Sequence, residues 1–178
     1  MSGTVAHPAY VAVPGFESAR VGAALVVARP EALAWARDAL GRHRSLHAAA
    51  LADADLCLRG RGPIPVMLNP AGEGPAWAVR HYRRGGGMRI MDDRFLRLGR
   101  PRSLRELESS VRVRELGITT PRVVAAAVYP AGPFYRADLV TEFVHDAREL
   151  ADVVLGTPDS SAPPVHADTR AQALTCTA

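Results

Sequence analysis

Between residues 55 and 144, short apolar segments alternate with turns rich in glycine and proline, and this pattern constrains the fold most. Such segments are typical of β-strands in an antiparallel sheet, because each turn allows the chain to reverse direction. The turns are Gly60-Arg61-Gly62, the run from Pro70 to Pro75, and Pro130-Ala131-Gly132-Pro133. We expect five strands, in the ranges Asp55–Arg59, Pro63–Asn69, Trp77–Tyr82, Val123–Tyr129 and Phe134–Val144.

One amphipathic helix is expected over residues 104–116, between the third and fourth of these strands. Leu104, Leu107, Val111 and Leu116 fall on one helical stripe. Ser103-Leu104-Arg105-Glu106 has the pattern of a capping box, and Gly117 fits the helix end. The chain is therefore expected to form an α+β fold, with an antiparallel sheet of about five strands and one main helix.

A smaller α/β extension is expected over residues 1–52, ahead of this sheet. Ala23–Ala28 indicates a buried strand. A helix should begin at Pro30 and end before Gly41, and an alanine-rich helix should follow over residues 43–52. We therefore divide the chain into the extension, a main unit over residues 53–156 with a short helix near Ala147–Leu155, and a poorly ordered tail over residues 157–178.

The basic residues indicate an anionic partner. All 22 are arginine, and the formal net charge is +4. Between Arg83 and Arg105, eight arginines stand against two aspartates. Arginine suits phosphate because its planar guanidinium binds two oxygens at once. Nucleic acid, a phosphorylated small molecule and anionic lipid all fit this charge, but the arginines lie in a connector without aromatic platforms or a nucleic-acid motif, so we expect no nucleic-acid partner.

From residue 60 onward, the order of elements resembles the smaller lobe of a kinase-like fold. Gly60 and Gly62 would form the turn over the phosphates, and Arg80 stands where the third strand normally carries a lysine. Glu106 would orient that cation, and residues 142–144 would form the hinge that holds adenine. Each feature also has a simpler interpretation: a hairpin turn, an arginine at a strand edge, a helix cap and the end of a buried strand.

Several motifs resemble the bacterial lipopolysaccharide kinase family, which phosphorylates 3-deoxy-D-manno-octulosonic acid (Kdo) or core heptose. They occur in order over about residues 57–155. The resemblance is carried by Val79-Arg80-His81-Tyr82-Arg83-Arg84-Gly85-Gly86, Asp93-Arg94-Phe95-Leu96, Arg105-Glu106-Leu107, Leu116-Gly117-Ile118-Thr119-Thr120-Pro121 and Tyr135-Arg136-Ala137-Asp138-Leu139-Val140-Thr141.

This resemblance implies ATP and Mg²⁺ as cofactors and a lipid-linked sugar, nascent lipopolysaccharide, as acceptor. Gly60, Gly62, Arg80 and Glu106 would serve the ATP phosphates. Adenine would lie beside Glu142, Phe143 and Val144. The implied contacts of the anionic substrate are Arg83 and Arg84, while the residues that would hold the metal stay unassigned.

A kinase fold also needs a larger second lobe, which supplies the catalytic aspartate and the metal ligands. Val165-His166-Ala167-Asp168 resembles the family's catalytic loop, with Asp168 at the position of the base. Ala173 occupies the position of the metal-binding asparagine, and no equivalent of the second aspartate follows. The sequence therefore predicts a truncated small lobe with negligible phosphotransfer.

An alternative is a non-catalytic module that binds an anion or a lipid, formed by an isolated kinase small lobe. The longest apolar runs, such as Val123–Val128, are much shorter than the ~20 residues of a membrane-spanning helix. The sequence also has no pattern of a secretory signal. We therefore expect a cytoplasmic protein that attaches peripherally to the inner membrane, because the implied acceptor is lipid-linked and the arginines favour anionic headgroups.

Overall fold

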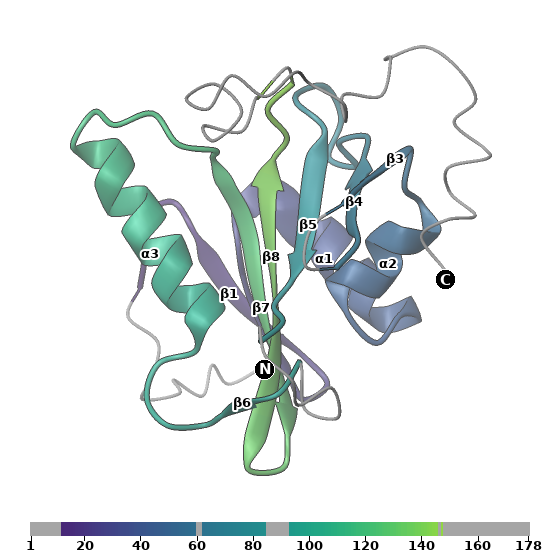
Figure 1. The fold of residues 1–178 in the computed structure, drawn as a ribbon, viewed down its shortest axis with the longest axis vertical. Helices are drawn as coiled ribbons and strands as arrows, with labels where there is room; N and C mark the ends of the chain where they lie inside the picture. Colours follow the sequence, from purple (N-terminus) through teal and green to yellow (C-terminus); the bar gives the residue numbers. More distant parts are fainter. Residues whose placement is uncertain (1–11, 60–61, 85–92, 146, 148–178) are drawn as a thin grey trace, which may run out of the picture.

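The computed structural model describes residues 12–59, 62–84, 93–145 and 147, which form an α+β fold with one antiparallel sheet (Figure 1). The hydrogen-bonded order of the strands is β1-β2-β7-β8-β5-β4-β3, and β6 also pairs with β8. The strands are β1 (Glu17–Val21), β2 (Ala24–Ala28), β3 (Leu56–Leu58), β4 (Ile64–Met67), β5 (Trp77–His81), β6 (Phe95–Leu96), β7 (Val123–Ala131) and β8 (Phe134–Glu142). The helices are α1 (Pro30–Arg42), α2 (Leu46–Ala52) and α3 (Arg102–Glu115).

The helices cover both faces of the sheet (Figure 1). Helix α3 packs on one face, against β7 and β8, whereas α1 and α2 pack on the opposite face. Each face has its own core, because successive side chains of a strand point to opposite sides. Val26 and Val27 of β2 illustrate this: both are fully buried, one in each core.

The central strands β7 and β8 form a hairpin, as the sequence predicts. Gly132 and Pro133 join the two strands. Gly132 has φ +63°, a backbone conformation that favours glycine. Both strands are buried along most of their length, because helices cover both sides of the sheet at this point.

The sheet is larger than the five strands that the sequence predicts. Within the residues that the structure describes it has eight, because β1 and β2 from the N-terminal extension join it and the short strand β6 pairs with β8. Strand β2 pairs with β7, from Leu25 opposite Val128 to Ala28 opposite Ala125. Strand β2 has apolar side chains on both faces, so both faces must be buried by other elements. Its place in this sheet, between the two cores, provides this burial. The domain boundary at residue 52 stays a prediction.

Helix α1 begins at Pro30, as predicted, but it continues to Arg42, so Gly41 lies inside it. The expected stop at Gly41 is therefore wrong by about half a turn. Helix α2 begins after Ser45, whose side chain accepts a hydrogen bond from the Ala48 N–H at 3.0 Å. The predicted short helix near residues 147–155 and the tail over 157–178 lie outside the described residues, apart from Ala147.

Helix α3 has the expected position but not the expected cap. Its N-cap is Pro101, without a side-chain hydrogen bond. Ser103 lies inside the first turn, fully buried, and its hydroxyl donates to the Ala127 carbonyl of β7 at 3.3 Å. The capping box is wrong because sheet packing turns Ser103 inward, which leaves Glu106 for another contact.

The apolar stripe of α3 is also shorter than predicted. Leu104 and Leu107 are fully buried against the sheet, and burial of each contributes about 1.5–3 kcal/mol. Leu116, the last predicted member, is 72% exposed because the helix has ended. Gly117 follows with φ +80°, so the predicted stop is confirmed.

Candidate functional site: a cleft between the sheet and α3

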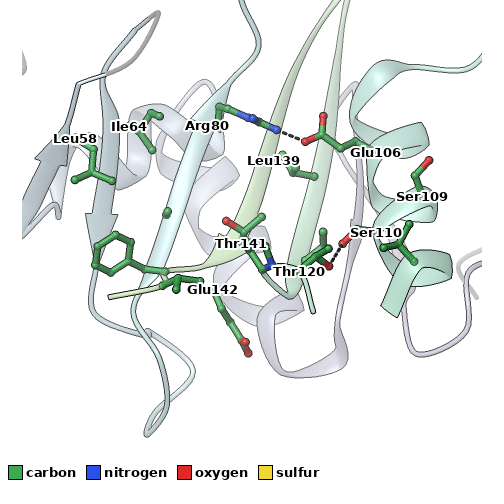
Figure 2. Close-up of a pocket in the computed structure, with 16 residues that line it drawn as sticks. Leu58, Ile64, Arg80, Glu106, Ser109, Ser110, Thr120, Leu139, Thr141 and Glu142 are labelled. Carbon is green, nitrogen blue, oxygen red and sulfur yellow. Dashed lines mark hydrogen bonds and ion pairs between the residues drawn. The ribbon is translucent and has the colours of Figure 1, made fainter. Parts of the chain in front are cut away.

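A cleft of about 500 Å³ lies on the α3 face of the sheet (Figure 2). Its walls come from β3, β4, β5, β7, β8 and α3, and from the segments just before β7 and just after β8. Most of the lining is apolar, and both α3 and the sheet contribute polar side chains to it. The cleft is lined by Leu58, Ile64, Ala78, Arg80, Glu106, Ser109, Ser110, Val113, Thr120, Pro121, Val123, Leu139, Thr141, Glu142, Phe143 and Val144.

Arg80 and Glu106 meet across this cleft. The Arg80 guanidinium donates to the Glu106 carboxylate, from β5 to α3, as Figure 2 shows. The predicted ion pair is therefore confirmed. The two side chains are 47% and 38% exposed, so both remain accessible from the cleft.

Tyr82 is a second partner of Glu106, a contact that no sequence pattern predicts. Its hydroxyl donates to Glu106 Oε2 at 2.5 Å. The Arg80 guanidinium also lies 5.2 Å from the centre of the Tyr82 ring. The Glu106 carboxylate thus stays hydrogen-bonded through Tyr82 even if Arg80 turns toward another anion.

The local electrostatics agree with this geometry. Burial acts to lower the pKa of Arg80, but the Glu106 carboxylate and Tyr82 act against it, and the pKa is raised overall. Burial and the Glu106 carboxylate raise the pKa of the Tyr82 hydroxyl well above its usual value. Tyr82 is therefore a neutral hydrogen-bond donor at physiological pH, and Arg80 is a permanent cation.

The alternation of β5 places these groups. Arg80 is two residues from Ala78 and from Tyr82, so all three point toward α3. Val79 and Trp77 point to the opposite core, under α1 and α2. On α3, Glu106 is adjacent to Leu107, whose burial against the sheet sets the rotation of the helix and brings Glu106 to the cleft.

The predicted hinge residues Glu142, Phe143 and Val144 line the end of the cleft where β8 ends. Sheet contacts already use two of their backbone N–H groups. The Glu142 N–H donates to Arg122 O at 2.8 Å, and the Phe143 N–H donates to Ala76 O at 2.7 Å. The Glu142 carboxylate accepts from Arg122 Nη1 at 3.0 Å.

Val144 differs from the other two hinge residues. It is 49% exposed, and within the described residues its N–H has no acceptor. Its main chain is thus the part of the hinge that is open to a ligand in the cleft.

The remaining candidates lie elsewhere. Gly62 lies under the Arg83 side chain, since a Cβ at Gly62 would be 3.1 Å from Arg83 Cδ. Arg84 lies over the Phe95 ring, 5.2 Å from its centre. Neither arginine is among the residues that line the cleft. Gly60 and Asp168 lie outside the described residues, so their roles stay predictions.

A second polar cluster, which the sequence does not predict, lies on the opposite face of the sheet. Asp138 of β8 is fully buried and accepts from the His47 N–H at 2.9 Å and the Tyr129 hydroxyl at 2.7 Å. Its Oδ1 lies 2.6 Å from His81 Nδ1. An aspartate within the apolar run from Ala137 to Val140 was the available signal, because a buried carboxylate needs several donors.

The residues that the structure describes contain no helix that is long and apolar enough to cross a membrane. They also contain no group of three or more His, Cys, Asp or Glu side chains that could hold a metal ion.

Curated relatives match part of the chain. A 3-deoxy-D-manno-octulosonic acid kinase of Vibrio cholerae is 35% identical over 107 residues, which cover 53% of this chain and 46% of the relative. A kinase of the same name from Stenotrophomonas maltophilia is 35% identical over 100 residues, covering 49% of this chain and 40% of the relative. The chain thus spans about half the length of the curated relatives it matches.

No solved structure matches the chain. The family profile described as lipopolysaccharide kinase (Kdo/WaaP) matches residues 70–173, more than half of the sequence. This range includes Arg80, Glu106 and the hinge residues. The chain therefore belongs to the lipopolysaccharide kinase (Kdo/WaaP) family.

Proposed function

We propose that this chain forms the nucleotide-binding small lobe of an ATP-dependent kinase that phosphorylates a hydroxyl of a lipopolysaccharide core sugar, Kdo or heptose. The observation that carries the proposal is the Arg80–Glu106 pair, held across a cleft between a sheet and one helix. A cation on the third strand of the lobe, oriented by a glutamate of the following helix, is the arrangement that kinases use for ATP phosphates.

The dimensions of the cleft suit a nucleotide. Its volume of about 500 Å³ lies within the ~300–1,000 Å³ usual for ligand pockets. We place adenine against the apolar wall near Leu139 and Phe143, with the open N–H of Val144 as its hydrogen-bond donor. The phosphates then extend toward Arg80, whose guanidinium binds them bidentately while Tyr82 keeps Glu106 in place.

We assign the glycine turn and the neighbouring arginines to the phosphates and the acceptor. Gly60 and Gly62 would let the backbone approach the phosphates closely. The side chain of Arg83 lies over Gly62, so a cation stands beside this turn. Arg83 and Arg84 would meet the anionic acceptor, nascent lipopolysaccharide.

Mg²⁺ and the catalytic base complete the proposal. The described residues do not fit a magnesium site, so we derive no step through the metal from them. Asp168 is the proposed base, which would accept the proton of the sugar hydroxyl as the γ-phosphoryl group is transferred. Since a small lobe supplies few of the groups that stabilise the transition state, we expect negligible phosphotransfer from this chain alone.

We also propose that the chain works at the cytoplasmic face of the bacterial inner membrane, in peripheral contact with anionic lipid. The support is the lipid-linked acceptor of the family and the excess of arginine between residues 83 and 105. Each arginine that reaches the surface adds about 1 kcal/mol of attraction.

Nucleotide binding tests the central claim. A fluorescent ATP analogue should bind the parent chain saturably, and unlabelled ATP should displace it. Arg80→Gln should weaken binding about tenfold, the effect of losing a charge-assisted contact. Arg20→Gln is the matched control, because Arg20 is exposed on β1, remote from the cleft. Equal affinity of both variants would refute the role of Arg80, and absence of saturable binding would favour the non-catalytic alternative.

A further inference from the structure

The second polar cluster lies on the α1 and α2 face of the sheet, facing away from the nucleotide cleft. His81 follows Arg80 in β5, so the two side chains point to opposite faces. Asp138, directly opposite His81 in the register of β5 and β8, fixes the imidazole through Nδ1. The His47 N–H, the His81 imidazole and the Tyr129 hydroxyl all bond to the Asp138 carboxylate. This carboxylate is also fully buried, so it is not available to a ligand.

Above this cluster lies a cavity of about 120 Å³. It is lined by Arg44, Ser45, His47, His81, Tyr129 and Arg136 among its polar residues. At ~30 Å³ per water molecule the volume suits a small tetrahedral ion, but it is too small for a nucleotide. The lining brings two guanidinium groups and two imidazoles to one small space.

The two guanidinium groups of this cavity have little negative charge close to them. Arg44 is exposed and pairs with no carboxylate among the described residues. Arg136 has Asp93 as its nearest carboxylate, at 3.8 Å. Burial acts to lower the pKa of His81, but the hydrogen bond and charge of Asp138, together with Asp93, raise it overall, so the imidazole carries positive charge more readily than usual.

The Asp93 carboxylate lies near two of the cationic groups that line this cavity. Its Oδ2 lies 3.5 Å from His81 Nε2 and 3.8 Å from Arg136 Nη1, so one carboxylate oxygen stands between both cations. Both distances exceed those of a normal hydrogen bond. A ligand with more oxygens and more charge could therefore make closer contacts than Asp93 does.

We propose that the cavity between Arg44, Arg136 and His81 binds a phosphate monoester group, in competition with Asp93. Two guanidinium groups and the His81 Nε2–H offer donors to three oxygens, which a phosphoryl group has and a carboxylate does not. The group can belong to a soluble phosphomonoester or to a lipid headgroup. The site is independent of the proposed nucleotide cleft, because it lies on the other face of the sheet.

The test is a titration of the 178-residue chain with inorganic phosphate at constant ionic strength, followed by NMR of the His81 and arginine side chains. We expect a saturable shift. Arg136→Gln and Arg44→Gln should each weaken phosphate binding about tenfold, whereas Asp93→Asn should strengthen it about three- to tenfold by removing the competing carboxylate. Arg37→Gln, an exposed arginine on α1 that does not line the cavity, is the matched control and should leave binding unchanged.

Vesicles identify the source of the phosphate. Binding to vesicles of phosphatidic acid that depends on Arg136, with none to phosphatidylcholine, assigns the site to a lipid headgroup. Binding of free phosphate without vesicle attachment assigns it to a soluble phosphomonoester. The proposal is overturned if the parent binds neither, if Arg136→Gln equals Arg37→Gln, or if Asp93→Asn does not bind more tightly. The Arg136→Gln variant should bind the ATP analogue with the same affinity as the parent. Loss of phosphate binding at the cavity can therefore be distinguished from loss of nucleotide binding in the cleft.

Discussion

Replacing Asp138 by asparagine tests how strongly the buried cluster holds the sheet together. The carboxylate accepts from the His47 N–H and the Tyr129 hydroxyl at Oδ2, and from His81 at Oδ1. Asparagine has the same shape but only one accepting oxygen. If that oxygen keeps the two contacts at Oδ2, the amide NH₂ faces His81 Nδ1. Both groups are then hydrogen-bond donors when the imidazole is protonated, so the variant disfavours the protonated form.

The expected loss of stability is about 2–4 kcal/mol. One charge-assisted hydrogen bond to a charged group is lost, worth ~1.5–3 kcal/mol, and two others become bonds to a neutral acceptor, each weaker by a fraction of that. At ~2–4 °C per kcal/mol for a chain of this size, the midpoint of thermal unfolding should fall by about 5–15 °C.

Urea unfolding followed by circular dichroism at pH 7 measures this loss. Asp38→Asn is the matched control, since Asp38 forms an exposed pair with Arg42 one turn along α1 and should cost less than about 0.5 kcal/mol. A loss below 1 kcal/mol for Asp138→Asn, or a loss equal to that of the control, would refute the view that this cluster is a strong structural element.

The same variant should change how stability depends on pH. The pKa of His81 is raised in the folded protein, so its protonation stabilises the fold fully below the unfolded pKa of about 6.5. This contribution is lost as pH rises through the folded pKa. Asp138→Asn removes the main cause of the raised pKa, so the parent should lose more stability than the variant between pH 6 and pH 8.

Two further predictions concern the cleft and the activity. Tyr82→Phe removes the second donor to Glu106, so we expect a loss of about 1–2 kcal/mol in stability and a two- to fivefold weaker affinity for the ATP analogue, measured by urea unfolding and by displacement titration. Unchanged values would mean that Arg80 alone holds Glu106. We also expect no phosphotransfer above background from this chain with ATP, Mg²⁺ and a Kdo-bearing lipid acceptor. Turnover that disappears in Asp168→Ala would contradict this and identify Asp168 as a working base.

Much of the sheet could be predicted from the sequence because its signals are local. Each predicted strand between residues 55 and 144 has glycine or proline near at least one end, and Gly132 marks the hairpin of β7 and β8 by requiring positive φ. The Arg80–Glu106 contact was also predictable, but from the resemblance to a kinase lobe rather than from any local pattern.

Other features depend on packing between distant residues, which local patterns do not encode. Ser103 and Glu106 match a capping box, yet the same spacing also allows Ser103 to face the sheet and Glu106 to face the cleft. The pairing of β2 with β7 joins segments about a hundred residues apart, so no turn signals it. The donors to Asp138 come from α2, β5 and β7, which only the folded sheet brings together.

The two polar sites are linked by the register of β5. His81 lies opposite Asp138, and Arg80 lies opposite Leu139, in the same antiparallel pairing. A slip of one residue would move Arg80 into the buried cluster and His81 into the cleft, because side chains alternate between the faces. The slipped strand would place the guanidinium where the imidazole now contacts Asp138 and would leave Glu106 without its cation. The His81–Asp138 contact therefore does more than stabilise the fold: it favours the single register in which Arg80 faces Glu106 in the cleft.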